Sequence, residues 1–355
     1  MGEAAEHAIA LAERLGDADA LYRALRSLQS TRFVGARLTD AMELSQRLQV
    51  LSRDVPERSA DGDHAMAGSL AMAGDLDGAI TYFERAEAGY DPVLDRTAMS
   101  VIGSSLAVFT AAWHSHALWL AGLCDRAAMT SERAVRLADT LGHAYSRALA
   151  NAYAAVFHFM RRNRRRCLTH ARATVDICDK HGFAYYVHWG RLLAAWAELG
   201  AMTDPRVSRM TAAIAGMEAE GAAVRRPFYL SVQAMALARA GRDQDARAAL
   251  AEAQARVEAT EERWWTPELI RLQGLLAPTE EARLACLRGA VARGLELRAR
   301  PLAARAAVSL ARFLSARGLR RDACAELARV LDASPPRSGD RDRRRAERLL
   351  ARLSS

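Results

Sequence analysis

Two histidines that stand two residues apart are the first residues of this chain that could carry out chemistry. They belong to His114-Ser115-His116, and on a helix that spacing turns the two rings about 200° apart, which is poor geometry for one shared metal ion. Neither Ser104-Ser105 nor the histidines provide a nucleophile and a base at a recognised spacing. We therefore predict no catalytic residue, no metal site and no cofactor, and we expect that the chain is not an enzyme.

The densest charge cluster is Arg161-Arg162-Asn163-Arg164-Arg165-Arg166, at an expected turn between two helices. Its guanidinium groups cannot all find carboxylates nearby in the chain. Arg161, Arg162, Arg164, Arg165 and Arg166 are therefore candidates for a basic patch that binds a phosphate-rich or acidic partner. The simpler interpretation is a solvated basic turn, because no aromatic residues alternate with the arginines to stack nucleic-acid bases.

Aromatic and cationic side chains also gather near residue 190, on the expected first helix of a helix pair. Tyr185, His188 and Arg191 are candidates for a partner-binding groove, because aromatic rings with an arginine can anchor a peptide or a small ligand. Trp189 and Trp196 are seven residues apart and share one helix face. That spacing favours packing of the two tryptophans in the core between repeats.

Composition restricts the class of protein. The chain has 355 residues and a formal net charge of +8, and Lys180 is its only lysine. Lys180 lies outside any glycine-rich phosphate loop, which excludes a P-loop nucleotide site. The five cysteines form no C-x-x-C pair, which favours a reducing, cytoplasmic setting. The N-terminal residues lack the features of a secretion signal, and no apolar stretch reaches the ~18 residues that span a bilayer, so we expect no membrane association.

Turn signals recur at intervals of about forty residues. In each unit a glycine, or once an asparagine, ends a helical run, and a small or apolar residue follows five positions later. The turn residues of this series are Gly74, Gly122, Asn163, Gly200, Gly241 and Gly318, and a second series contains Gly142, Gly182 and Gly221. Two interleaved series indicate two helices per repeat, which is typical of a helical solenoid.

Apolar stripes define the helices between these turns. Over 243–259, Ala246, Leu250, Ala253 and Val257 share one face. We predict an all-α fold, a right-handed α-solenoid of about seven to eight antiparallel helix pairs. The expected pairs are 17–52, 60–91, 99–140, 143–180, 184–220, 226–259, 264–295 and 299–333. The predicted organisation is a half-repeat helix at 1–16, the solenoid at 17–333, a linker at 334–340 and a C-terminal capping helix at 341–355.

The N-terminal helix is expected to lack a partner helix. Its apolar stripe contains Ala4, Ala8, Leu11, Ala12 and Leu15. Because a solenoid needs capped ends, this stripe predicts a fragment of a longer protein, completion by a partner, or a homodimer through the N-terminal half-repeat.

Several segments resemble the tetratricopeptide-repeat family. They are Ala117-Leu118-Trp119-Leu120-Ala121-Gly122, Lys180-His181-Gly182-Phe183, Arg226-Pro227-Phe228-Tyr229-Leu230 and, most specifically, Glu262-Arg263-Trp264-Trp265-Thr266-Pro267-Glu268-Leu269-Ile270-Arg271-Leu272-Gln273-Gly274. The chain is similar to the C-terminal repeats of bacterial multidomain signalling proteins that carry AAA/STAND-type ATPase, adenylate/guanylate-cyclase-like or LuxR-type modules. The resemblance covers about residues 20 to 333, and it implies a sensing or docking arm.

Three functions follow as expectations. The first is a non-catalytic scaffold or regulatory domain that binds a protein or peptide partner, or attached domains of a longer parent, in bacterial signalling. The second is a ligand-sensing regulatory domain of an ATPase, a nucleotide cyclase or a transcriptional regulator. The third is a basic solenoid that binds nucleic acid, which is disfavoured because stacking aromatics are absent from the arginine cluster.

Overall fold

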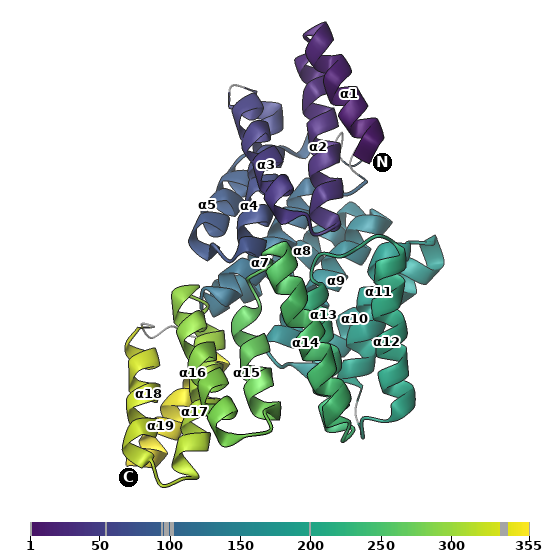
Figure 1. Cartoon of the computed structure of the whole chain (residues 1–355). Coiled ribbons are helices and arrows are strands. Elements are labelled where there is room, and N and C mark those ends of the chain that lie inside the picture. Colours follow the sequence, from purple (N-terminus) through teal and green to yellow (C-terminus); the bar gives the residue numbers. More distant parts are fainter. Residues whose placement is uncertain are drawn as a thin grey trace.

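A computed structural model describes residues 2–53, 55–93, 95, 99, 103–198, 200–333 and 340–354. These residues form eighteen helices and no strand, and sixteen of the helices make eight consecutive antiparallel pairs (Figure 1). The first helices of the pairs are α2 (Ala18–Val34), α4 (Pro56–Ala73), α7 (Leu106–Leu120), α9 (Ala144–Met160), α11 (Ala184–Ala197), α13 (Arg226–Arg239), α15 (Thr266–Leu276) and α17 (Arg300–Ser315). The second helices are α3 (Leu38–Ser52), α5 (Leu76–Ala88), α8 (Cys124–Leu141), α10 (Arg164–His181), α12 (Asp204–Ala219), α14 (Asp243–Thr260), α16 (Glu280–Glu296) and α18 (Arg320–Asp332).

The prediction of an all-helical solenoid built from helix pairs is confirmed. In α14 the buried residues include Ala246, Leu250, Ala253 and Val257, which are the apolar stripe expected from the sequence. Alanines on these faces let neighbouring helices approach closely, and the polar residues between them lie on the opposite, solvent-exposed face of the helix. Local apolar patterns in the sequence are therefore sufficient to predict the helix pairs.

Turn glycines separate the helices as the spacing predicts, with one exception. Gly122 and Gly241, for example, have φ angles of 80° and 78°, in the left-handed region that favours glycine. Asn163, the expected turn residue of the fourth pair, does lie in the turn, but it does not take the left-handed conformation. Arg162 has the positive φ angle, 57°, whereas Asn163 has φ −93° and caps α10 by accepting a hydrogen bond from the backbone N–H of Arg166 at 3.2 Å.

Gly241 offers a test of these turns, because an added Cβ would meet no atom within 4 Å and would act only through its backbone conformation. We expect Gly241→Ala to lower the free energy of unfolding by about 1 kcal/mol, and Gly241→Asn to lower it less, since asparagine tolerates the left-handed region better. Gly289 is the matched control. It lies within α16, and its added Cβ would lie 3.7 Å from Ile270 Cγ2, an ordinary contact. Gly289→Ala should therefore stabilise by about 0.5–1 kcal/mol. Urea unfolding measures all three changes, and equal losses for both alanine variants would contradict the assignment.

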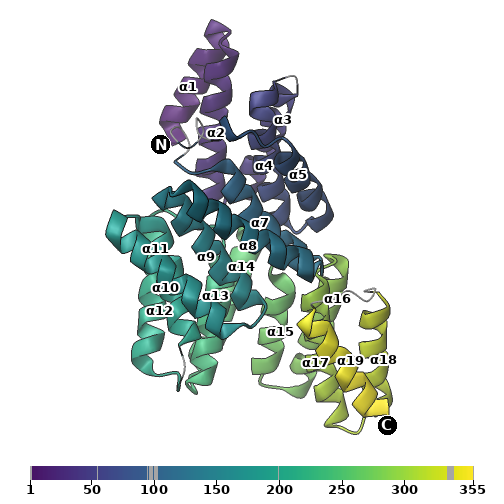
Figure 2. The same cartoon turned by 180° about the vertical axis from the view of Figure 1, so that it is seen from behind.

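The first helices of successive pairs line the inside of the superhelix. From α4 onward each contacts the next, in the order α4, α7, α9, α11, α13, α15 and α17. The chain coils far enough that α17 also contacts α7, and Figures 1 and 2 show the C-terminal pairs returning alongside the middle of the chain. The superhelix is therefore closed along its axis by contacts between its successive turns.

These closing contacts keep a constant register of five helix pairs. In the first pair, the carbonyl oxygen of Val34 accepts hydrogen bonds from the backbone N–H groups of Ala223 (2.9 Å) and Val224 (3.0 Å). These two residues lead into the sixth pair. In the second pair, the carbonyl oxygen of Met72 accepts a hydrogen bond from the backbone N–H of Arg263 (2.8 Å). Arg263 leads into the seventh pair. The same register holds for the third and fourth pairs, here through side-chain donors. Arg300 Nη1 donates to the carbonyl oxygen of Ala121 (2.9 Å), and Arg341 Nη1 donates to the carbonyl oxygen of Arg162 (3.3 Å).

The two terminal helices pack against neighbours. α1 (Gly2–Leu15) contacts α2 and buries Ala5, Ile9 and Ala12. Of the predicted stripe only Ala12 is buried, while Ala4, Ala8, Leu11 and Leu15 are exposed. The predicted stripe was misplaced by one residue, because its members do not all share the face that meets α2.

At the other end, α19 (Arg341–Ser354) packs on α17 and α18 and buries Ala346 and Leu349. Residues 334–339 of the expected linker lie outside the described residues.

Candidate ligand-binding cavity

A cavity of about 310 Å³ lies inside the first turn of the superhelix. Its walls come from the first helices of the first five pairs and from the segment that leads into the sixth. The lining residues are Arg26, Gln29, Ser30, Phe33 and Val34 of α2, His64, Ala65 and Gly68 of α4, Phe109 and Trp113 of α7, Tyr145 and Tyr153 of α9, Tyr185 and Tyr186 of α11, and Val224 with Arg225. Its volume is at the lower end of the range for small-ligand sites in proteins.

Seven of the sixteen lining residues are phenylalanine, tyrosine or tryptophan, and several of their rings pack against one another. Phe109 stacks on Trp113 with ring centroids 5.7 Å apart, and Phe33 meets the same indole edge-on at 5.2 Å. Gly68 permits this arrangement, because an added Cβ would lie only 3.0 Å from two carbons of the Trp113 ring. Such interlocked rings form a rigid apolar surface that suits an aromatic or aliphatic ligand group.

Arg225 lines the cavity and is the most unusual residue in it. Its side chain is buried, with 1% of the residue exposed, and its backbone has a φ angle of 66°. The centre of its guanidinium lies 5.2–5.4 Å from the ring centroids of Trp113, Tyr153, Trp189 and Trp264. These ring faces stabilise the buried cation by cation–π attraction.

No carboxylate of the described residues forms an ion pair with Arg225. Its Nη2 has no hydrogen-bond partner there, and Nη1 lies 3.5 Å from Nδ1 of His116. Glu262 is the acid that interacts with this loop; the charge of Arg225 lowers its pKa, but its hydrogen bonds go to the loop and not to the guanidinium. Glu262 accepts from the backbone N–H of Arg225 at 2.8 Å and from Nε1 of Trp264 at 2.8 Å. The cavity therefore borders a positive charge that is compensated mainly by aromatic faces.

Burial controls the protonation of the groups around this charge. It raises the pKa of Glu262 to about 7 against the opposing hydrogen bonds from Trp264 and Arg225. It lowers the pKa of His64 to about 3, with a further lowering by the charge of Arg26, and it raises the pKa of Tyr153 to about 12 although Arg225 opposes this. At neutral pH, His64 is uncharged and Tyr153 keeps its proton.

Arg26 is the other cation of the wall, and it is already neutralised. Its Nε donates to both oxygens of Asp61, at 2.9 and 3.0 Å. The lining residues include no aspartate or glutamate. The net electrostatic character of the cavity is therefore positive, and Arg225 is the source.

The structure separates the three groove candidates. Tyr185 lines the aromatic cavity, whereas His188 and Arg191 line a different hollow of about 360 Å³ between α10, α11 and α12. Arg191 also forms an ion pair with Asp179 at 2.9 Å. Trp189 and Trp196, in contrast, are both buried.

The arginine cluster is also dispersed. Arg161 lies over the ring of Phe157, and Arg164 donates to the backbone carbonyl of Glu198. Arg166 pairs with Glu132 at 3.0 Å, Arg165 is exposed, and burial together with the charge of Arg305 lowers the pKa of Arg162 to about 10. The five arginines therefore have different local contacts in the fold.

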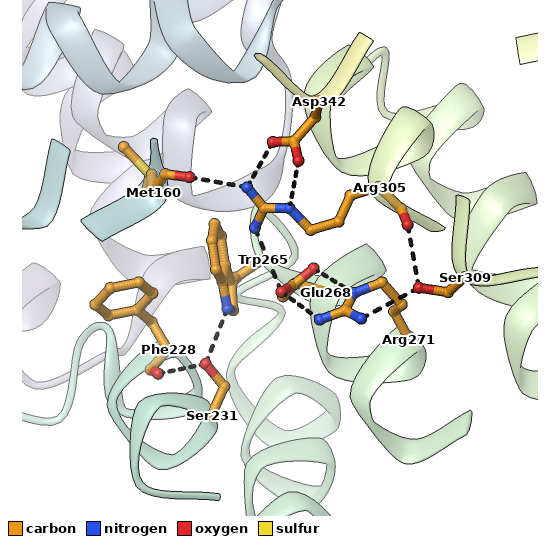
Figure 3. A network of polar contacts seen from close by, with 9 residues as sticks. All are labelled: Met160, Phe228, Ser231, Trp265, Glu268, Arg271, Arg305, Ser309 and Asp342. Atoms are coloured by element: carbon orange, nitrogen blue, oxygen red, sulfur yellow. Dashed lines mark hydrogen bonds and ion pairs between the residues drawn. The ribbon is translucent and has the colours of Figure 1, made fainter. Parts of the chain in front are cut away.

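A second buried polar centre joins the turn of the fourth pair to the C-terminal helices (Figure 3). Glu268 accepts from Arg271 at 2.8 Å through each oxygen, and its Oε1 also accepts from Arg305 at 3.3 Å. Arg305 also donates hydrogen bonds to the carboxylate of Asp342 (2.7 Å) and to the backbone carbonyl of Met160 (2.8 Å). Burial alone would raise the pKa of Glu268, but the charges of Arg271, Arg305 and Arg162 outweigh it and lower that pKa to about 2.

The histidines considered first for chemistry have separate roles. Nδ1 of His114 lies 3.0 Å from Glu87, and Nε2 of His116 lies 2.9 Å from the carbonyl oxygen of Tyr153. Within the described residues no group of three or more histidines, cysteines and acids could hold a metal ion. No helix of the described chain has the length and apolar character needed to cross a bilayer.

The sequence analysis missed most of the cavity. Phe33, Phe109, Trp113 and Tyr153 come from three different helices and become neighbours only through the coiling of the chain. Arg225 is adjacent to the segment Arg226-Pro227-Phe228-Tyr229-Leu230, which carries part of the family resemblance. That position, two residues before Pro227 at the start of α13, was the available signal.

Comparison with solved structures places this fold. The Rap protein in complex with Competence and Sporulation Factor matches 94% of this chain and 97% of that chain, at 10% identity and a TM-score of 0.56. The Cut9–Hcn1 hetero-tetramer of the APC/C matches 95% of this chain and 56% of that chain, at 12% identity and a TM-score of 0.51. A STAND protein from Pyrococcus horikoshii with a tetratricopeptide repeat sensor matches 88% of this chain and 48% of that chain, at 13% identity and a TM-score of 0.47.

No protein-family model matches the sequence, and no curated protein matches it significantly. The family resemblance seen in the sequence and the structural matches agree on one architecture. The chain has the helical-solenoid fold of tetratricopeptide-repeat proteins.

Proposed function

We propose that this protein is a non-catalytic regulatory scaffold that holds a short peptide segment of a partner, or of its own parent protein, inside the superhelix. The observation that carries the proposal is the aromatic cavity, which joins five consecutive first helices around one site. A bulky side chain of a bound peptide would fill it and serve as the anchor, since buried aromatic contacts dominate recognition energies. The Rap protein, which shares the fold, was solved with Competence and Sporulation Factor bound.

A small effector is the second candidate occupant. It is favoured by the limited volume, about 310 Å³, which suits one compact molecule better than several peptide side chains. In that case the protein would act as the ligand sensor of a signalling protein. Both functions use the same wall of aromatic rings.

The test begins with a random peptide display library that is panned against the wild-type chain. Selected peptides are then measured by fluorescence anisotropy. We expect Ala65→Phe, which places a ring in the cavity, and Tyr185→Ala, which removes part of its wall, to weaken binding ~10-fold or more. Circular dichroism and the melting temperature identify any variant that fails to fold.

Two control variants separate the cavity from the other candidate sites. Arg191→Ala changes the neighbouring hollow, and the double reversal Arg164→Glu with Arg165→Glu changes the basic turn. Neither should alter affinity by more than about twofold, because neither residue set lines the cavity. Peptides that tolerate the cavity variants but lose affinity with the arginine reversals would overturn the proposal.

A further inference from the structure

The buried guanidinium of Arg225 indicates which kind of ligand the cavity binds. Its guanidinium is permanently charged and buried, and it has no carboxylate partner among the described residues. A buried charge is normally paired, because an uncompensated ion in a low-dielectric interior is costly. Aromatic faces supply part of the missing stabilisation, but they accept hydrogen bonds poorly.

Two buried hydrogen-bond donors of this cage have no partner among the described residues. Nη2 of Arg225 and Nε1 of Trp189 are both buried without a hydrogen-bond partner. The two groups belong to one cage, since the guanidinium lies 5.4 Å from the Trp189 ring. Both can only donate, so a ligand that completes this site must bring acceptors.

The other charged groups near the cavity do not supply that acceptor. Asp61 is engaged by Arg26 and by the hydroxyl of Tyr22 at 3.0 Å. Both oxygens of Glu262 already accept hydrogen bonds from the loop around Arg225. His64 interacts through Nδ1 with Thr110 at 3.0 Å, and His116 lies against the Tyr153 carbonyl. The cavity thus combines an apolar, ring-lined wall with one unpaired cation.

We propose that the cavity binds a carboxylate carried on a compact aromatic group, with the carboxylate at Arg225 and the aromatic body against Trp113 and Phe109. This inference rests on the proposed function, because it assigns the ligand class of that same cavity. A guanidinium and a carboxylate form charge-assisted, often bidentate hydrogen bonds. The pair gains strength when the aromatic body excludes water from it.

The first experiment uses the wild-type chain and a matched pair of probes, indole-3-propionate and indole-3-propionamide. The two have the same shape, but only the first is charged. Isothermal titration calorimetry should show the acid binding at least ~10-fold more tightly than the amide. Equal affinity of the two probes would overturn the inference, and so would the absence of binding at millimolar concentration by both probes and by the tripeptide described below.

Variants then test whether Arg225 is the charge that causes the preference for the acid. Arg225→Gln should abolish the preference for the acid while leaving the affinity of the amide unchanged, and Arg225→Lys should keep part of the preference. Ala65→Phe should abolish binding of both probes. A preference for the acid that survives in folded Arg225→Gln would overturn the assignment to this residue. If Arg225→Gln does not fold, the acid and amide comparison on the wild-type chain still decides the question.

A final comparison identifies the source of the carboxylate. The tripeptide Gly-Gly-Trp carries the same indole and carboxylate at a chain end, and its C-terminal amide is the control. Preference for the free tripeptide over its amide, with no binding of indole-3-propionate, supports the same chemistry supplied by a peptide. Selected peptides that depend on the cavity but bind equally well as acid and amide would leave the scaffold function intact and overturn the carboxylate inference.

Discussion

Replacing Glu268 with glutamine is expected to lower the free energy of unfolding by about 3–5 kcal/mol. Glu268 is buried and neutralises two buried guanidiniums, with Arg271 at 2.8 Å and Arg305 at 3.3 Å. Glutamine has nearly the same shape but no charge, so the variant leaves an excess of positive charge in the interior. Urea unfolding followed by circular dichroism measures the loss, and hydrogen exchange should locate it in α15, α17 and α19.

The matched control is Glu326→Gln. Glu326 pairs with Arg329 at 2.6 Å within α18, at the protein surface. Surface pairs of this kind contribute little, so the loss should stay below about 0.5 kcal/mol. The double variant Glu268→Leu with Arg271→Met should be less destabilising than Glu268→Gln alone, because it removes a charge together with its partner. A loss for Glu268→Gln no larger than that of the surface control would refute the role given to this network.

Glu262 is expected to make the fold less stable as the pH rises from 5 to 8. Its pKa is about 7 in the folded chain, against an ordinary value of 4.5. The folded state therefore holds a proton that the unfolded state releases, and the stabilising contribution is complete below pH 4.5 and is lost as the pH passes 7. The shift corresponds to roughly 2–3 kcal/mol over this range.

The difference in unfolding free energy between wild type and Glu262→Gln isolates this contribution, because the other titrating groups are shared. Measured by urea unfolding at several pH values, that difference should move in favour of the glutamine variant by roughly 2–3 kcal/mol between pH 5 and 8. Glu268→Gln provides the contrast. The pKa of Glu268 is about 2, so its difference from wild type should stay flat over the same range. A flat profile for Glu262→Gln would show that Glu262 is ionised throughout.

Local features of the sequence were sufficient to predict the helix pairs. Most pairs have a turn glycine at one of their turns and an apolar stripe on their helices, and both signals lie within about twenty residues of each other. At Asn163 the turn lies where the sequence predicts it, but the left-handed residue is displaced by one position. Arg162 takes the left-handed position, and Cys167 corresponds to the buried Ala127 of the preceding pair. A non-glycine residue at such a position gives no signal that composition can reveal.

The candidate sites were harder to predict because they depend on direction as well as position. Successive residues of a helix turn by about 100°, so Tyr185 and Arg191 point about 120° apart. That angle explains why Tyr185 reaches the cavity and Arg191 reaches the neighbouring hollow. Arg225 depends on still longer-range geometry. Its cage joins Trp113, Tyr153, Trp189 and Trp264, and only the accumulated rotation of five pairs brings these rings together.

The five-pair register also has a consequence for the order in which the chain can fold. In an open solenoid each repeat needs only its neighbour, so folding can follow synthesis closely. Here the carbonyl of Val34 receives its partner from Val224, which emerges 224 − 34 = 190 residues later. At ribosomal rates of about 5–20 residues per second, the first pair waits roughly 10–40 s for that contact. During this interval Phe33 and Trp113 lack Val224 and Arg225, which line the same cavity in the finished protein, so the nascent first turn holds aromatic rings that are not yet covered.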